Sequence, residues 1–386
     1  MQPIRITGSE SQNQLLYFTS NSLLAGDDGI VFISERTGHP NIFYKDLCTG
    51  KEQQLTFNEE GSLKSYVYFW GNEYKGFGKA SVSLHVESGN IYYIQGRNIC
   101  KVDIRGNQKV LSELPDNQVT AFTHISFDGT RLCVPTTDAR ALVYDTHQDT
   151  QRYSPDYDID KRVQEENLNS YLRVFDTVSG KEIITECVPK SWITHVQFCP
   201  TDNNLILYNH EWPSDCGIRR MWLWDGKRHI RLRTESNGRS REDWTCHEMW
   251  QRDGKEIIYH GAYKNKIPYI GKMKADGTNI IEIPLPELYC KYGHFTVSNL
   301  GMLVSDGYYQ EKDEGKEGPG QWISIQKVDW ENRKIQWIPL CKSGSSWDSQ
   351  DSHPHPIFNN GDTAIYFTSN QEGFRAVYGI DIPQIW

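Results

Sequence analysis

The segment WDSQDSHPHPIF, residues 347–358, places two histidines two positions apart, each directly before a proline. Because a proline disfavours the helical conformation of the residue before it, we expect His353 and His355 to be extended. Residues i and i+2 of an extended chain project to the same face, so these two imidazoles, with the carboxamide of Gln350 nearby, can bind one metal ion. The alternative is a proline-rich surface loop whose histidines have no function.

The elements that would position these histidines recur along the chain. Residues 26–56 alternate turns with short apolar strands, residues 359–382 repeat the start of that pattern, and weaker copies bring the total to seven units. Antiparallel repeats of roughly 40 to 70 residues are typical of propeller blades. We therefore predict an all-β, seven-bladed β-propeller that forms a single domain over residues 1–386. A pair of β-sandwiches is the alternative, but it would not explain one unit recurring from end to end.

The repeat pattern gives weaker predictions for two further segments. Residues 146–164 are polar and lack the pattern, so we expect a loop between strands of the third blade. The early segment NQLLYFTS, residues 13–20, is a candidate for the strand that completes the last blade.

A histidine stands at the same place in five of the units, three residues before a large apolar residue or valine and just ahead of a turn. Such a strand should be the innermost of its blade, and innermost strands line the central channel. Equivalent histidines of successive blades should therefore converge on one cavity. The alternative is a histidine that bonds only within its own blade, as in WD repeats, although regular Trp-Asp endings are absent here. The five residues are His124, His195, His247, His294 and His355.

Two of the five, in neighbouring units, complete a ligand set. His294 and His355, together with His353 and Gln350, would offer three imidazoles and one amide oxygen. All four are neutral, so a divalent cation would keep its charge and open coordination positions. These donors suit Mn, Fe, Co, Ni or Zn, and ligand type alone does not choose among them.

Two further residues suit chemistry beside a cation. His247 is a candidate general base, because a positive field disfavours its own protonation. Arg220 can bind a carboxylate through two parallel hydrogen bonds, although surface solvation is the alternative for such an arginine. Together they favour β-elimination from a uronic acid, in which the base takes the C5 proton beside a neutralised carboxylate and the C4–O bond breaks. Cys246, next to His247, is expected to be a bystander. We expect the substrate to contact His124, His195, His210, Arg219 and Trp347.

Composition excludes some partners and indicates a compartment. The 386 residues carry a net charge of −9, which argues against a nucleic-acid backbone as partner. No apolar run suggests a signal peptide or a membrane span. The nine cysteines are scattered without a CxxC pair, which favours reduced thiols and a cytoplasmic protein. Nothing in the sequence predicts the oligomeric state.

Five segments of the chain resemble the oligogalacturonate lyases, seven-bladed propellers of bacterial pectin breakdown: NHEWPSD, RRMWLW, CHEMW, GHFTVSNLGMLVSDG and SHPHPIFNNGDTAIYFTSN. The resemblance implies that the base is His247 and that the catalytic arginine is Arg220. It also implies a Mn²⁺ ion held by His294, Gln350, His353 and His355. The implied substrate is a short uronic-acid oligosaccharide, and the product an unsaturated uronate.

The N-terminal third and the insert QEKDEGKEGPGQW, residues 310–322, depart from the family pattern. Such loops can change which sugar lies beyond the uronate. A lyase for another uronate glycan, for example one of rhamnose and glucuronate, therefore stays open. A TolB-like propeller that only binds, and a glycoside hydrolase that releases saturated products, are the alternatives from other classes.

Overall fold

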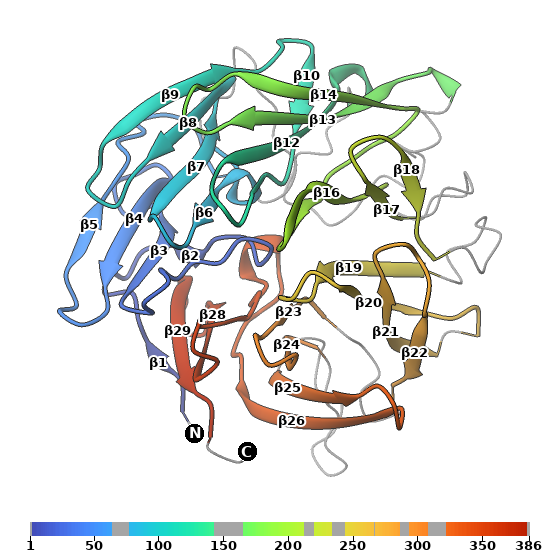
Figure 1. The fold of residues 1–386 in the computed structure, drawn as a ribbon. Helices are drawn as coiled ribbons and strands as arrows, with labels where there is room; N and C mark the ends of the chain where they lie inside the picture. The colour runs from blue at the N-terminus through green and yellow to red at the C-terminus, as the bar shows by residue number, and fades with distance from the viewer. Residues whose placement is uncertain are drawn as a thin grey trace. The chain divides into compact units, whose positions relative to one another are not determined.

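The computed structural model describes residues 2–63, 77–142, 165–211, 220–233, 244–265, 267–285, 293–307 and 322–383. Their strands form seven antiparallel sheets (Figure 1). This confirms the prediction of an all-β, seven-bladed β-propeller. Among the described residues, no helix combines the length and the apolar character that a membrane crossing requires.

Five sheets each contain four consecutive strands in chain order. The first two comprise β2 (Asn13–Leu15), β3 (Gly29–Ser34), β4 (Asn41–Asp46) and β5 (Glu52–Gln54), then β6 (Ser83–His85), β7 (Asn90–Gln95), β8 (Asn98–Val102) and β9 (Gln108–Glu113). The next two comprise β15 (Val196–Cys199), β16 (Asp202–Asn209), β17 (Met221–Trp224) and β18 (His229–Arg231), then β19 (Trp244–Trp250), β20 (Glu256–Ala262), β21 (Pro268–Lys274) and β22 (Ile281–Pro284). The last comprises β23 (Phe295–Val297), β24 (Leu303–Ser305), β25 (Trp322–Asp329) and β26 (Lys334–Lys342).

The other two sheets vary this plan. One has a divided first strand, because two short strands both pair with the second: β10 (Gln118–Thr120), β11 (His124–Ile125), β12 (Arg131–Asp138), β13 (Asn169–Asp176) and β14 (Glu182–Pro189). The other joins three C-terminal strands to an N-terminal one: β27 (Ile357–Phe358), β28 (Ala364–Ser369), β29 (Ala376–Asp381) and β1 (Ile4–Arg5). The described residues also include the short 3₁₀ turns η1 (Lys79–Ser81), η2 (Ala139–Leu142) and η4 (Gln350–Ser352).

The strand that completes the C-terminal sheet is not the one expected. The blue β1 lies beside the red β29 in Figure 1, with Ile4 opposite Gly379. Residues 13–20 were the candidate for this place, and that prediction is wrong. Asn13–Leu15 is instead the first strand of its own sheet, paired with β3. The backbone N of Asn13 still donates to the carbonyl of Arg375 at 2.8 Å, so the segment touches the last sheet without joining it.

The chain divides into two compact units. The first contains residues 1–36, 45–51 and 242–386, and the second contains residues 37–44 and 52–241. The prediction of a single domain over residues 1–386 is therefore kept as a prediction.

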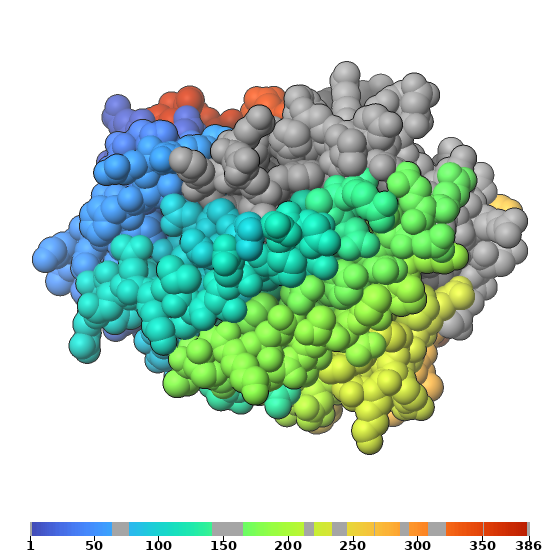
Figure 2. All heavy atoms as spheres, turned by 90° about the horizontal axis from the view of Figure 1, so that it is seen from above, coloured from blue at the N-terminus to red at the C-terminus, as the bar shows by residue number. Residues whose placement is uncertain are grey.

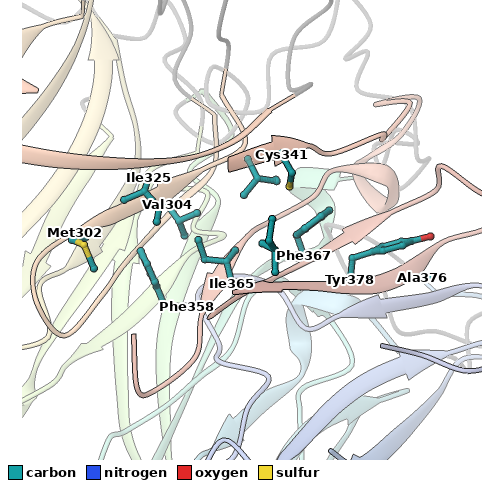
Figure 3. Packing of buried hydrophobic residues seen from close by; sticks show 11 residues of the cluster. Met302, Val304, Ile325, Cys341, Phe358, Ile365, Phe367, Ala376 and Tyr378 are labelled. Atoms are coloured by element: carbon teal, nitrogen blue, oxygen red, sulfur yellow. The ribbon is translucent and has the colours of Figure 1, made fainter. Parts of the chain in front are cut away.

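Apolar side chains between successive sheets make the core of each unit. In the first unit, β24 and β25 face β28 and β29 across a buried cluster that includes Val304, Ile325, Ile365 and Phe367 (Figure 3). In the second unit, Leu172 and Val174 of β13 pack with Phe198 of β15 and Ile206 of β16. Most residues of β24, β28 and β29 are buried, so both faces of these strands are covered.

A close contact between two sheets of the second unit requires a glycine. Gly180, in the turn between β13 and β14, has a φ of +74°, and a Cβ there would overlap the carbonyl oxygen of Leu111 in β9. Lys109 of β9 donates to the carbonyl of Val178 in the same turn at 3.4 Å. The teal and green surfaces of these two sheets abut in Figure 2. Glycine is the residue that tolerates both the left-handed backbone and the close approach.

Candidate metal centre and its histidine neighbours

Three histidines of the first unit come together as predicted. His294 directly precedes β23, and His353 and His355 lie between η4 and β27. One ligand atom from each lies within 4.8 Å of the others, and all three side chains are buried. The ring centroids of His294 and His355 are 4.2 Å apart, and those of His294 and His353 are 5.1 Å apart. Three imidazoles at this separation can ligate one transition-metal ion.

The backbone conformation at His353 and His355 differs from the extended one that was expected. His355 has a φ of +46°, so the prediction that it is extended is wrong, and His353 lies in a bend after η4 rather than in a strand. A left-handed residue with a Cβ is strained and persists only where its surroundings enforce it. Here the backbone N of His355 donates to a buried carboxylate oxygen of Asp306 at 3.2 Å.

Asp306, which follows β24, organises the centre and was missed from the sequence. Its Oδ1 accepts from the backbone N of His294 at 2.7 Å, and its Oδ2 lies 3.1 Å from Nδ1 of the same histidine. An ionised carboxylate can only accept, so Nδ1 of His294 carries the hydrogen and Nε2 is left to bind a metal. Burial raises the pKa of Asp306 to about 6, while the nearby His353 opposes this. The only sequence signal was an aspartate after an apolar strand.

The donor set fits a metal ion with nitrogen ligands. Three imidazoles can act as ligands. The carboxylate of Asp306 orients one of them, His294, and this arrangement is common at metal centres. Gln350, the fourth predicted ligand, begins η4, three residues before His353. Its side chain lies outside what the structure describes, so its role as a ligand stays a prediction.

Aromatic rings surround the three imidazoles. Phe18, from the segment after β2, has its ring centroid 5.4 Å from that of His294 and stacks on His355 at 5.5 Å. Trp347 lies 4.1 Å from His353 and stacks on His294 at 6.0 Å. Trp347 was predicted to contact substrate, whereas Phe18 was missed, because its segment was expected to serve only as a strand. These rings restrict the imidazole orientations and reduce the polarity around the centre.

His247 lies beside the metal centre. Its ring centroid is 4.5 Å from that of His294. It has a φ of +51° and lies where the pairing of β19 with β20 shifts register, so a β-bulge turns the chain here. Its Nδ1 is 2.7 Å from Nε2 of His260 and 3.3 Å from the carbonyl oxygen of Gly293. Cys246, expected to be a bystander, has its sulfur within 4.8 Å of a nitrogen of each of these two histidines.

Arg220 lies in the second unit, directly before β17, and is held by a buried carboxylate. Its Nη1 is 3.2 Å from Oε1 of Glu211, and both side chains are buried. The other oxygen of Glu211 accepts from Asn209 Nδ2 at 2.7 Å and from the hydroxyl of Thr194. The network fixes the position of the guanidinium, which has five donors and can therefore hold Glu211 and a further anion together.

His195 belongs to the same network. Arg220 Nη2 and Asn209 Nδ2 each lie 3.0 Å from its Nδ1. Oε2 of Glu211 is 3.5 Å from the same nitrogen, but the guanidinium can only donate, so we take Nδ1 as an acceptor. The hydrogen is then on Nε2, and His195 offers a donor rather than a base.

Of the remaining residues predicted to contact substrate, the structure describes two and leaves one undescribed. Nδ1 of His124 accepts from the backbone N of Phe198 at 3.2 Å, a contact between sheets of the second unit. His210 is buried among rings, with its centroid 5.3 Å from that of Trp222, and this burial lowers its pKa to about 3. Arg219 lies outside the described residues. Contact with substrate stays a prediction for each of them.

The first unit therefore contains the three-histidine metal centre and, beside it, His247, which is hydrogen-bonded to His260. The second unit holds a fixed guanidinium beside an imidazole donor. The first set suits charge stabilisation and proton transfer, and the second suits recognition of a carboxylate.

Known proteins provide a comparison. The model of the oligogalacturonate lyase family matches residues 70–385. An oligogalacturonide lyase of Pectobacterium atrosepticum is 24% identical over 410 residues, which cover 99% of this chain and 94% of the relative. An oligogalacturonate lyase of Dickeya dadantii is also 24% identical, with the same coverage. The solved structure of an oligogalacturonate lyase in complex with manganese superposes with a TM-score of 0.75 at 22% identity, covering 98% of this chain and 93% of that one.

Proposed function

The chain belongs to the oligogalacturonate lyase family, and from that premise we propose that it cleaves short oligogalacturonides by metal-assisted β-elimination. One observation carries the proposal: His247 lies beside the three-histidine cluster, with 4.5 Å between the ring centroids of His247 and His294. A general base next to a cation centre is what removal of a proton beside a carboxylate requires.

His294, His353 and His355 would hold the metal, with Gln350 as a fourth ligand. Manganese is our choice, because the related solved structure contains it and the amide oxygen of Gln350 is a donor that suits it. A bound cation would neutralise the uronate carboxylate and so stabilise the negative charge that develops when the C5 proton leaves.

Side chains of the protein transfer the proton and bind the substrate. His247 takes the C5 proton, the electrons of that bond form the C4–C5 double bond, and the C4–O bond breaks as its oxygen takes up a proton from solvent. Arg220, held by Glu211, binds a substrate carboxylate through its remaining donor capacity. His195 donates from Nε2 to a substrate oxygen, and His124, His210, Arg219 and Trp347 complete the proposed substrate contacts.

The proposal also includes the compartment. The seven cysteines among the described residues are all free, which supports a reducing environment such as the cytoplasm.

The test is ultraviolet absorbance during incubation with di- and trigalacturonate, with Mn²⁺ and with chelator. We expect absorbance of the unsaturated product to rise with Mn²⁺, to stop with chelator, and to be lost in His247→Ala. His39→Ala, at a half-buried histidine bonded to the carbonyl of Gly61, is the matched control and should keep full activity.

No rise from folded, metal-loaded protein would refute the pectin assignment. Glucuronate-containing oligomers would then be the next substrates to assay. Saturated products would instead indicate a hydrolase. If His294→Ala and His353→Ala left the metal content unchanged, the metal centre itself would be wrong.

A further inference from the structure

In three successive sheets, the histidine at the first strand meets a polar side chain at the second strand, across the hairpin. The ring Nδ1 of each histidine is the atom that makes the contact, at 3.0 to 3.1 Å in two of the pairs and at 2.7 Å in the third. The pairs are His294 with Asp306, His195 with Asn209, and His247 with His260.

The surrounding groups decide which ring nitrogen carries the hydrogen in the first two pairs. Asp306 accepts, so His294 carries it on Nδ1. Arg220 donates to Nδ1 of His195, so that residue carries it on Nε2. His260 is itself an imidazole and can do either, so its pair with His247 needs a third group to decide the direction.

The third group is the carbonyl of Gly293. Its oxygen lies 3.3 Å from Nδ1 of His247, and a carbonyl oxygen can only accept. Nδ1 of His247 therefore carries the hydrogen and shares it between this oxygen and the nearer Nε2 of His260, at 2.7 Å. The lone pair of His247 is consequently on Nε2, the form that a general base needs.

His260 is a rigid partner. It lies in the middle of β20, is 2% exposed, and meets the fully buried Phe295 edge-on at 6.2 Å. His247 approaches it from a bulge with a strained, left-handed backbone, which indicates that the surrounding contacts hold the two rings together.

Cys246 raises a competing possibility, a second metal site made with His247 and His260. The separation of 2.7 Å between the two nitrogens is the length of a hydrogen bond. Two nitrogens on one tetrahedral zinc ion would lie about 3.3 Å apart, given zinc–nitrogen bonds of about 2.0 Å. The geometry therefore favours a hydrogen bond.

We propose that His260 is a positioning residue, which accepts the Nδ1 hydrogen of His247 and holds that histidine in the tautomer with an unprotonated Nε2. The catalytic consequence rests on the function proposed above, in which His247 is the base.

The first experiment reads the tautomer directly, without substrate. Metal-free protein labelled with ¹⁵N-histidine is examined by ¹⁵N NMR, with the His247→Ala spectrum used to assign the signals. We expect the wild-type Nδ1 of His247 to be protonated and Nε2 to be unprotonated. A hydrogen on Nε2 of His247 in the wild type would overturn the proposal, whatever the activity of the protein.

The second experiment compares substitutions at His260. Gln has an amide oxygen close to the place of Nε2, so His260→Gln should keep the tautomer and most of kcat. Asn has the same amide but is one methylene shorter, so His260→Asn should lose both, as should His260→Phe. We expect kcat to fall by about 10²-fold in those two, with KM nearly unchanged.

Equal kcat in the Gln and Asn variants would overturn the proposal, and so would an unchanged tautomer in the Asn variant. If His260→Phe does not fold, the comparison of Gln with Asn still decides. A protein without lyase activity that nevertheless shows the expected tautomers would refute the proposed function and leave the role of His260 in place.

Discussion

The carboxylate of Asp306 contacts His294 twice, accepting from its backbone N at 2.7 Å and from its ring Nδ1 at 3.1 Å. The same carboxylate accepts from the backbone of His355 at 3.2 Å. One buried side chain thus orients a predicted metal ligand and supports the strained backbone of another. The integrity of the metal centre depends on Asp306 as much as on the imidazoles.

Asp306→Asn should weaken binding of Mn²⁺ by about 10- to 100-fold. An amide can present its NH₂ group to Nδ1 of His294, as Asn209 does to His195, and that would move the ring hydrogen to the nitrogen needed by the metal. Binding is measured by electron paramagnetic resonance of free Mn²⁺. Asp202→Asn, at an exposed position of another sheet, is the control. Equal affinity in wild type and Asp306→Asn would contradict the orienting role.

Gly293→Ala should also reduce metal affinity, although it removes no polar group. A Cβ on Gly293 would overlap Oδ1 of Asp306 and approach the backbone of that residue to 3.0 Å, so the carboxylate must move. Gly26→Ala is a suitable control, since the nearest atoms there, at 3.3 Å, belong to the flexible carboxyl group of Asp28. The same Mn²⁺ titration measures both variants. Unchanged affinity in Gly293→Ala would mean that the position of Asp306 does not control the centre.

Glu211→Ala should destabilise the protein by about 3–5 kcal/mol, because it leaves the charge of Arg220 buried without its carboxylate. The double substitution Glu211→Ala with Arg220→Met should recover part of that loss. Urea unfolding measures both. As a control, Lys255→Ala breaks an exposed pair with Asp253 and should cost less than about 1 kcal/mol. A double variant no more stable than the single one would show that the charge of Arg220 is not the cause.

His210 should make the folded state sensitive to acid. Burial lowers its pKa from 6.5 to about 3, with a smaller contribution from His229. Between these values the unfolded chain binds a proton that the folded protein does not, so stability falls as the pH falls through this window. On going from about pH 7.5 to about pH 5.5, wild type should lose about 1.4 kcal/mol more than His210→Gln. Urea unfolding of metal-free protein at both pH values measures the difference, and parallel losses would refute the assignment.

The sequence was sufficient for the architecture and for the residue types of the centre. Turn residues and alternating apolar strands are local signals, so seven units could be recognised, and the histidine three residues before an apolar position marked the first strand of five of them. His294, His353 and His355 were predicted as a set, and they lie together. The extended backbone expected at His355 was wrong, because a proline only biases the conformation of the residue before it. The hydrogen bond to Asp306 outweighs that bias.

Only the tertiary structure decided what each histidine can do. Asp306, Asn209 and His260 lie 12, 14 and 13 residues after the histidines that they orient, across hairpins whose register the sequence does not specify. Phe18 reaches the centre from the opposite end of the chain. A residue type determines that an imidazole is present. Whether it donates, accepts or ligates depends on the group that faces its second nitrogen, and that group is chosen by strand pairing and packing.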